Sequence, residues 1–318
     1  MTQLEIALQR LLMRPVPAPL TQLEDWWQRE RRLREELGDP TARAIVLAGE
    51  SGRLGLAFAG GFHAALARLG GGLDPCGVRR VAFCATEAEG AHPRAIKTSL
   101  APEGSGFRIH GEKTWATLGG SAEELLVVCR QGERSDGRPK LVVARVDATA
   151  PGVTRTAARP TPFCPEITHC GFGFDTVIDG ADLLPGDGYA DYLKPFRTVE
   201  DSHVQLAVCA YFIGVSGRLG LAPAWSEVLS ALLLSCWSVA GLDPKQSTTH
   251  AALAGLERQV AELIPGFEEA WSDVGGAEWH AWERDRALLR VAQGARDARR
   301  EAARRQLASR MAAVRVEA

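Results

Sequence analysis

Between about residues 79 and 197 the sequence holds a series of short apolar runs with no helical stretch between them, and this feature constrains the fold most. The runs are rich in β-branched residues, and some alternate between apolar and polar positions, as half-buried strands do. Strands this short and frequent are typical of an antiparallel barrel or sandwich. The runs fall at residues 81–84, 107–110, 125–129, 141–144 and 167–178. We therefore expect a middle β domain over residues 79–197.

Helical patterns precede this β segment. Leucines keep helical spacing over residues 4–12, and the alanine- and leucine-rich residues 54–69 predict another helix that ends at a run of glycines. Thr21 is expected to cap a helix between these two, because Glu24 follows three residues later, as in a capping box. The pattern predicts an N-terminal helical domain over residues 1–78.

Helical periodicity returns from about residue 198. Proline and glycine interrupt it at several places, including residues 265–266, so that four helices are expected. Four antiparallel helices joined by short loops indicate a bundle. The expected helices cover residues 204–221, 226–240, 248–264 and 278–310. The fold class is therefore α+β, with a C-terminal four-helix bundle over residues 198–318.

Charge and hydropathy exclude several classes of function. The formal net charge is −2, so the chain has no overall electrostatic preference for nucleic acid or acidic membranes. The most apolar stretch, residues 228–240, is shorter than the ~20 residues that cross a bilayer. The first residues lack the continuous apolar centre of a signal peptide. We expect a cytoplasmic protein that binds neither membrane nor nucleic acid.

The cysteines give no sign of a disulfide framework. The chain has seven of them, an odd number, and no CxxC pair that would indicate a zinc ribbon. Cys164, His169 and Cys170 come nearest to a metal-binding group, but no second ligand pair follows at a suitable spacing. We interpret them as small buried side chains and expect no metal.

The segment from residue 81 to 120 carries three motifs in order. They are Phe83-Cys84-Ala85-Thr86-Glu87, Ile96-Lys97-Thr98 and Gly111-Glu112-Lys113-Thr114-Trp115-Ala116-Thr117. This order resembles the middle domain of the acyl-CoA dehydrogenases, where an aromatic-x-x-Thr-Glu strand precedes Ile-Lys-Thr and then Gly-x-Lys-x-Trp. The helical, β, helical order agrees with that family independently. The resemblance implies an acyl-CoA dehydrogenase-like fold in a divergent, shortened member of the family.

The resemblance also implies an FAD site. In the family, the residues that match Phe83, Ala85 and Thr86 present hydrogen-bonding groups to the pyrimidine edge of the flavin, whose polar atoms are costly to bury unpaired. Trp115 would lie near the ring face, where an aromatic side chain excludes water. Thr117 would place a hydroxyl near the redox-active nitrogen. Singly, each residue is better explained as part of a core or strand, and only their order favours a flavin site.

The family's catalytic base is missing from its usual position. The residue that matches the glutamate, shortly after Arg284-Asp285, is Gln293. An amide cannot act as a general base at neutral pH. Some members carry the base on the first helix of the C-terminal bundle, where Glu200 is the candidate in this chain. The preferred alternative is that Glu200 and Asp201 are acids favoured near a helix N-terminus by the macrodipole.

Two further departures concern ligand binding. Ala91 stands where the family has a serine that helps to hold a phosphate, which weakens the case for CoA. The segment with which a neighbouring subunit of the family grips the adenylate half of FAD has no match in the chain.

The last helix carries ten arginines between Arg284 and Arg315. The favoured interpretation is a bundle helix with a solvated basic face, and contact with DNA phosphates is the alternative. The residues expected to face the core of the bundle are Leu288, Val291, Ala295, Ala298 and Ala302.

These observations favour an FAD-dependent oxidoreductase acting on CH–CH bonds, by α,β-dehydrogenation of an acyl-CoA or related thioester. One alternative is a base-less, non-catalytic or partner-dependent subunit of a heteromeric acyl-CoA dehydrogenase, which Gln293 fits. Another is a flavin monooxygenase on the same fold, which needs no base for an α-proton. Subunit contacts in the family imply a homo-oligomer, and a full-length homologous subunit is the alternative partner.

Overall fold

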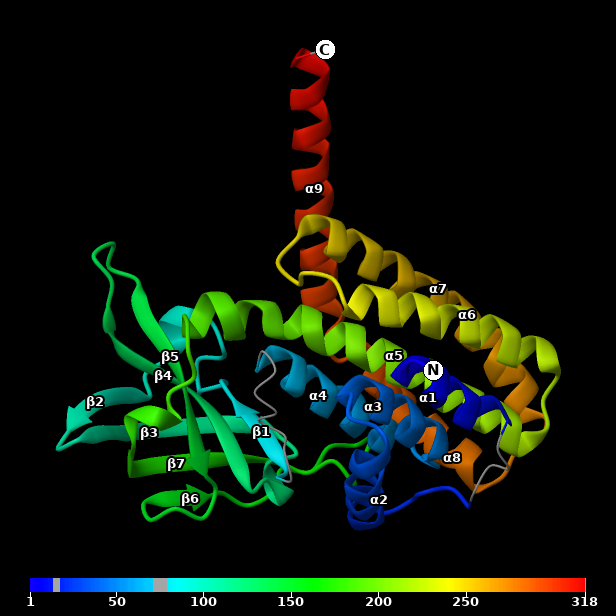
Figure 1. Ribbon diagram of the computed structural model, residues 1–318, viewed down its shortest axis with the longest axis horizontal. Helices are drawn as coiled ribbons and strands as arrows, with labels where there is room; N and C mark the ends of the chain where they lie inside the picture. Colours follow the sequence, from blue (N-terminus) through cyan, green and yellow to red (C-terminus); the bar gives the residue numbers. More distant parts are fainter. Residues whose placement is uncertain (14–17, 71–78, 318) are drawn as a thin grey trace. The chain divides into compact units, whose positions relative to one another are not determined.

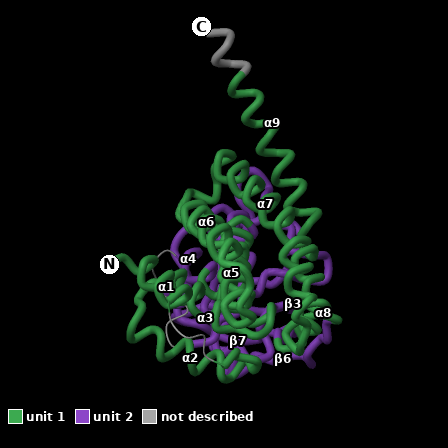
Figure 2. Tube along the Cα trace, turned by 90° about the vertical axis from the view of Figure 1, so that its right-hand side faces the viewer, with its two compact units in different colours: residues 1–64, 162–166, 198–318 green, residues 65–161, 167–197 purple. Residues whose placement is uncertain are grey.

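The computed structural model describes residues 1–13, 18–70 and 79–317. The chain divides into two compact units, coloured separately in Figure 2. Unit 1 is helical and comprises residues 1–64, 162–166 and 198–318, and unit 2 contains the β-sheet and comprises residues 65–161 and 167–197.

Unit 2 is built on a seven-stranded sheet with the order β1-β4-β2-β3-β7-β6, in which β5 also pairs with β4. Figure 1 shows the sheet at the left of the view. The strands are β1 Val81–Cys84, β2 Ser99–Glu103, β3 Gly106–Thr117, β4 Glu124–Glu133, β5 Pro139–Asp147, β6 Val153–Arg155 and β7 His169–Ile178. Every predicted strand is present, whereas β2 was missed because its Ser-Leu-Ala-Pro-Glu sequence has no apolar run.

Most of the sheet is antiparallel, as expected, but β1 and β4 pair in parallel from Val81 opposite Glu124 to Cys84 opposite Val127. The antiparallel pairs are β2 with β3, β3 with β7, β4 with β5 and β6 with β7. A parallel pair needs a long connection between its strands, and the hairpin of β2 and β3 lies within that connection.

The core of unit 2 is formed by side chains from one face of these strands. Three cysteines belong to it, Cys84, Cys129 and Cys170, each 0% exposed. Burial raises the pKa of the Cys84 and Cys129 thiols to about 12, so these side chains are neutral and pack as small apolar groups. Their role is structural, and of the three only Cys170 belongs to the group that the sequence analysis interpreted as small buried side chains.

The helices are α1 Gln3–Met13, α2 Leu23–Glu36, α3 Pro40–Glu50, α4 Leu54–Leu69, α5 Lys194–Leu219, α6 Pro223–Ala240, α7 Ser247–Ser272, α8 Ala277–Asp285 and α9 Gln293–Glu317. A π-helical turn, Gly188–Leu193, leads directly into α5, and a 3-10 turn, Arg286–Arg290, follows α8. None of the described helices is both long and apolar enough to span a membrane.

Two helix boundaries differ from the sequence prediction. Helix α2 begins at Leu23, and its N-cap is Gln22 without a side-chain hydrogen bond, so Thr21 is not the cap. Helix α7 continues through Pro265 to Ser272. A proline inside a helix costs about 3 kcal/mol, but the part of α7 beyond it buries Phe267 and Trp271 completely, and two buried aromatic side chains outweigh that cost.

The predicted last helix is interrupted, and it buries a different face from the one expected. Val291 is 65% exposed, and Ala295, Ala298 and Ala302 are exposed as well. Over residues 293–311, where burial is described, the buried residues of α9 are Arg296 and Ala303. The orientation of α9 is set by ion pairs of its arginines, which are described below. The prediction was wrong because it rested on the spacing of the alanines, which carries no information about such pairs.

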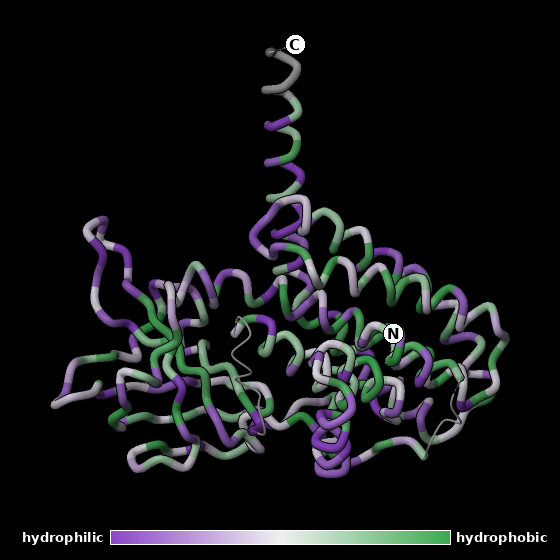
Figure 3. The backbone as a smooth tube through the Cα atoms, in the orientation of Figure 1, coloured by the Kyte–Doolittle hydropathy of each residue, from purple (hydrophilic) through white to green (hydrophobic). Residues whose placement is uncertain are grey.

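The core of unit 1 is aromatic. The Tyr211 ring of α5 contacts those of Trp271 and Trp282, with centroids 6.2 and 6.3 Å away. The neighbouring Phe212 ring lies 5.1 Å from Trp282 and 4.7 Å from Phe267. Hydropathy colouring shows the contrast with α2, where hydrophilic residues prevail along the helix (Figure 3). The aromatic side chains supply much of the apolar burial that holds α5, α7 and α8 together.

Candidate functional site

The motifs singled out in the sequence meet at the end of strand β1. Thr86 and Trp115 form an isolated antiparallel bridge, and the Thr114 amide donates a hydrogen bond to the Thr86 carbonyl at 2.8 Å. Thr117 lies two residues further along β3. Thr86, Trp115 and Thr117 are all half-buried, so part of each side chain remains open to a ligand. Three of the five predicted flavin-binding residues are therefore brought together in one part of unit 2.

A buried ion pair fixes this junction. Lys113 Nζ lies 2.7 Å from Glu87 Oε1 and 2.6 Å from the Val128 carbonyl oxygen. Glu87 also accepts hydrogen bonds from the amides of Lys97 and Thr98. Burial alone would raise the pKa of Glu87, but the Lys113 ammonium and these amides together hold it below its usual value. All three motifs thus contribute to one network beside Thr86 and Trp115.

Phe83 and Ala85 direct their side chains into the protein. Each is 6% exposed, and the Phe83 ring packs on Phe196 with 4.6 Å between centroids. Only their backbone groups remain to meet a ligand, which is the role that the resemblance implies for them. That role stays a prediction.

His169 lies against a predicted site residue, Trp115, although the sequence analysis interpreted it only as a small buried side chain. Its ring stacks on Trp115, with centroids 4.4 Å apart and 23° between the ring planes. Consecutive strand residues point to opposite faces of a sheet, so His169 and Cys170 cannot ligate one metal together. The only sequence signal was a histidine at the start of a strand, which does not reveal its neighbour across the sheet.

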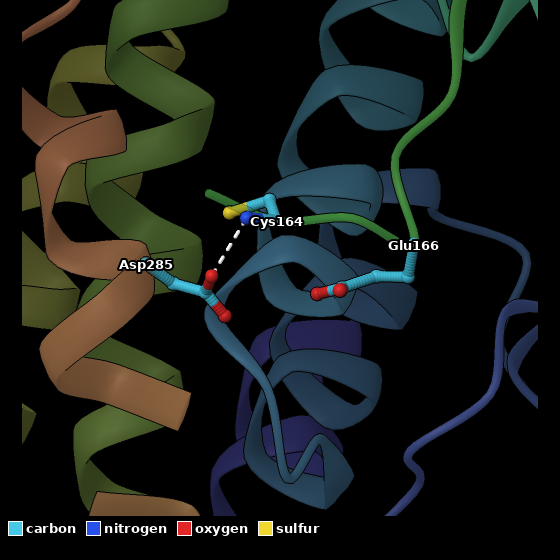
Figure 4. Close-up of side chains that lie close together, drawn as sticks. All are labelled: Cys164, Glu166 and Asp285. Atoms are coloured by element: carbon cyan, nitrogen blue, oxygen red, sulfur yellow. Dashed lines mark hydrogen bonds between the residues drawn. The ribbon is translucent and has the colours of Figure 1, made fainter. Parts of the chain in front are cut away.

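A different group of possible metal ligands lies in unit 1. Cys164, Glu166 and Asp285 each place a ligand atom within 4.8 Å of the others (Figure 4). The Cys164 amide donates to Asp285 Oδ1 at 2.6 Å, with Cys164 in a left-handed conformation at φ 45°. Neither carboxylate oxygen of Glu166 makes a hydrogen bond to another described residue, although its side chain is 5% exposed.

Two arginines already balance the charge of this cluster. Arg284 donates two hydrogen bonds of 2.7 Å to Asp285, and its Nη2 lies 4.0 Å from Glu166. Arg53 Nη1 lies 3.8 Å from Glu166. Burial, with both carboxylates close by, raises the pKa of Cys164, and burial raises that of Glu166. A cation would meet two guanidinium groups and a protonated thiol, so we assign the cluster a structural role that ties residues 162–166 to α8.

The two candidate base positions differ in environment. Glu200 lies in α5 and is 7% exposed. Gln293 is the exposed first residue of α9, and its amide donates to Asp297 Oδ1 at 3.0 Å. Neither observation identifies a base, and Glu200 stays a prediction.

Asp201, beside Glu200, is engaged by α9. Its carboxylate lies 2.6 Å from Arg299 Nη1 and 3.4 Å from Arg296 Nη1. Arg299 also pairs with Glu257 at 2.6 Å. Two arginines of the last helix, Arg296 and Arg299, are therefore paired with carboxylates in a largely buried network. The basic face that α9 presents to solvent is smaller than the sequence suggests.

A cavity of about 690 Å³ in unit 2 is lined by basic side chains that the sequence analysis missed. Arg94, Arg134 and Arg138 contribute to it, together with Asp136, Asp187 and Tyr189. Arg134 pairs with Asp187 and Arg138 with Asp136, whereas Arg94 makes no side-chain ion pair among the described residues. An unpaired guanidinium in a cavity favours an anionic ligand.

Comparison with known proteins agrees with this architecture. Residues 82–177 match the family model of the acyl-CoA dehydrogenase middle domain. The prolyl acyl carrier protein oxidase AnaB superposes with a TM-score of 0.68 at 14% identity, over 96% of this chain and 99% of AnaB. Butyryl-CoA dehydrogenase from Megasphaera elsdenii gives 0.67 at 13%, over 96% and 97%. A structure titled "PigA with FAD and proline" gives 0.65 at 14%, over 97% of both chains. No curated protein matches the sequence.

Proposed function

We propose that this chain, which has the acyl-CoA dehydrogenase fold and carries that family's middle domain over residues 82–177, is an FAD-dependent oxidoreductase acting on an acyl thioester. The observation that carries the proposal is the bridge between Thr86 and Trp115, which gathers the family's flavin-contacting motifs at one place. The proposed reaction is α,β-dehydrogenation of the acyl group.

The residues at this junction suit a flavin. The hydroxyls of Thr86 and Thr117 make no hydrogen bond to other described residues, so they are available to the polar edge of a planar ring. Trp115 is half-buried, lies opposite Thr86 and stands two residues before Thr117 in β3, and it offers an aromatic surface. A bound flavin would supply the capacity to accept a hydride from the substrate. The chain's own residues would bind and orient the ring and exclude water.

The proposed substrate is a thioester carried on an anionic group. AnaB is named as an oxidase of a prolyl acyl carrier protein, and the PigA structure was obtained with FAD and proline. Arg94 and its neighbours in the 690 Å³ cavity suit the phosphates of CoA or of a carrier-bound phosphopantetheine arm. This basic cavity supports an anionic carrier even though Ala91 replaces the family's serine.

Removal of the α-proton needs a base, and we propose Glu200 for this role because a carboxylate can perform it and Gln293 cannot.

A second candidate function rests on the same glutamine: a base-less, partner-dependent subunit that binds flavin but requires a full-length homologous subunit for turnover. The monooxygenase alternative requires no such base, and oxygen-dependent hydroxylation of a substrate would select it. We further propose that the chain forms a homo-oligomer, which native mass spectrometry would test.

The first experiment is an absorption spectrum of the purified protein before and after incubation with excess FAD and desalting. We expect retained flavin absorption in the wild type and its loss in Trp115→Ala, because the indole is part of the proposed contact. Thr154→Ala is the matched control, since Thr154 lies exposed on β6 of the same sheet. A wild type that retains no flavin would overturn the stand-alone oxidoreductase and leave the partner-dependent subunit to be tested by co-purification.

A further inference from the structure

His169 lies on the same face of the sheet as the proposed flavin-contacting residues of β3. In the pairing of β3 with β7, Thr117 and His169 are directly opposite each other. Side chains of directly opposite residues in an antiparallel pair point to the same face and lie about 5 Å apart at Cβ. The stack of the His169 imidazole on Trp115 shows that the indole is on this face too. Trp115, Thr117 and His169 thus form one group.

The imidazole carries an unsatisfied polar atom. His169 is 9% exposed, and its Nδ1 is buried without a hydrogen-bond partner among the described residues. Burial lowers the pKa of His169 to about 4, so the ring is neutral at physiological pH and offers one donor and one acceptor nitrogen. A buried polar group left without a partner costs about 1–3 kcal/mol.

Packing alone does not account for a histidine at this position. A phenylalanine would stack on Trp115 with a similar shape and would bury no polar nitrogen. The cost of the unpaired Nδ1 is offset if a ligand supplies the missing hydrogen bond. The ligand proposed for this face of unit 2 is a flavin, whose ring presents both donors and acceptors.

We propose that His169 completes the flavin site, where its ring holds Trp115 by stacking and its Nδ1 hydrogen-bonds the bound cofactor. The inference rests on the proposed function, because it needs FAD to occupy the junction of β1 and β3. The stack leaves one face of the indole covered by His169, so the cofactor contacts the other face or the edge of Trp115. His169 is then a binding residue through Nδ1 and a positioning residue through the stack.

The test compares His169→Phe and His169→Gln with the wild type in two measurements, FAD affinity by fluorescence titration and urea unfolding of the flavin-free protein. We expect His169→Phe to bind FAD about 3- to 10-fold more weakly, which is the effect of one lost hydrogen bond. His169→Gln, which retains a polar side chain, recovers part of that affinity. Without flavin, His169→Phe is at least as stable as the wild type, because it removes the unsatisfied nitrogen. His110→Phe is the control, since His110 lies on β3 with its side chain 73% exposed.

Each outcome separates the inference from the proposed function. A wild type that binds no FAD would overturn both. If the wild type binds FAD and His169→Phe binds it equally well, the proposed role of His169 is excluded, whereas the flavin site is not. Loss of stability in flavin-free His169→Phe, with unchanged affinity of the folded fraction, would show that the histidine serves only packing.

Discussion

The ammonium of Lys113 and the carboxylate of Glu87 form an ion pair of 2.7 Å, with side-chain exposures of 0% and 8%. The pair links the middle of β3 to the residue after Thr86, and a further hydrogen bond from Thr98 Oγ1 to Glu87 Oε1, 2.8 Å long, brings in the third motif. It explains why a Thr-Glu motif and a Gly-x-Lys-x-Trp motif occur in the same chain. Because Glu87 follows Thr86 and Lys113 lies two residues before Trp115, this buried contact helps to fix the position and the orientation of Thr86 and Trp115.

Removing the lysine is therefore expected to be costly. Lys113→Met leaves Glu87 buried without its cationic partner, and breaking a buried ion pair in this way costs about 3–5 kcal/mol of unfolding free energy. Urea unfolding measures the loss. The control is Lys97→Met, since Lys97 pairs with Glu89 at the surface with its side chain 65% exposed, and an exposed pair contributes about 0–1 kcal/mol. If the two variants lost similar amounts of unfolding free energy, the result would contradict a stabilising role of the buried Lys113–Glu87 pair.

The arginines of α9 should differ sharply in their contribution to stability. Arg299 contacts both Asp201 and Glu257 with its side chain 10% exposed, whereas Arg304 is exposed. We expect Arg299→Met to lower the free energy of unfolding by about 3 kcal/mol, because Glu257 loses its arginine and Asp201 keeps only the longer contact with Arg296. Arg304→Met should change it by less than ~0.5 kcal/mol. Thermal or urea unfolding measures both changes. Equally small changes in the two variants would indicate an entirely solvated basic face instead of this network.

Gly214 marks a close approach of α5 to α3. A Cβ at Gly214 would lie 2.0 Å from the carbonyl oxygen of Gly49, a backbone atom that cannot move aside. We expect Gly214→Ala to destabilise by about 3 kcal/mol or more through overpacking. Gly255→Ala in α7 is the matched change, since a Cβ there meets nothing within 4 Å, and it should stabilise by roughly 0.5–1 kcal/mol through helix propensity. If both variants raised the melting temperature, or both lowered it, the result would contradict this packing.

Acid should destabilise unit 1 through His63. This imidazole is 7% exposed and lies 4.5 Å from the Trp27 ring, and burial, reinforced by Arg34 and Arg43, lowers its pKa to about 3. The unfolded chain binds the proton with a pKa of about 6.5, so stability is present above that pH and is lost as the pH falls toward 3. Between pH 6.5 and 5 the wild type should lose about 2 kcal/mol more than His63→Phe. Parallel curves of unfolding free energy against pH would show that His63 does not contribute.

The identity of the base is tested by Glu200→Gln. If Glu200 removes the α-proton, turnover of a thioester substrate should fall by at least about 100-fold, the contribution typical of a general base, while FAD retention is unchanged. Glu227→Gln is the control, because Glu227 is exposed on α6. Wild-type turnover in Glu200→Gln would exclude the role, and absence of turnover in the wild type would favour the partner-dependent subunit.

Much of the fold follows from local patterns. The β-branched runs at residues 81–84 and 125–129 and the helical spacing of residues 54–69 identify their elements because side-chain periodicity is a property of the segment itself. The same holds for the motifs that contain Glu87 and Lys113, whose order is visible in the sequence. The matching family model over residues 82–177 confirms the fold that these motifs implied.

Other features were decided by neighbours that are distant in sequence. Pro265 remains within a helix because Phe267 and Trp271 bury themselves against other helices, and α9 turns Arg296 rather than Ala295 inward because Asp201 lies within reach. The strand pairing that places His169 opposite Thr117 cannot be read from either segment alone.

The sequence by itself thus determined most of the helices and strands, though not β2 or the break between α8 and α9, and it pointed to Thr86, Trp115 and Thr117 as one group. Only the tertiary structure decided what surrounds them: the Trp115–His169 stack, and the cavity to which Arg94 and Arg134 contribute from separate segments. The physical reason is that propensity and periodicity act over a few residues, whereas ion pairs, stacks and cavities depend on which distant side chains the fold brings within a few ångströms.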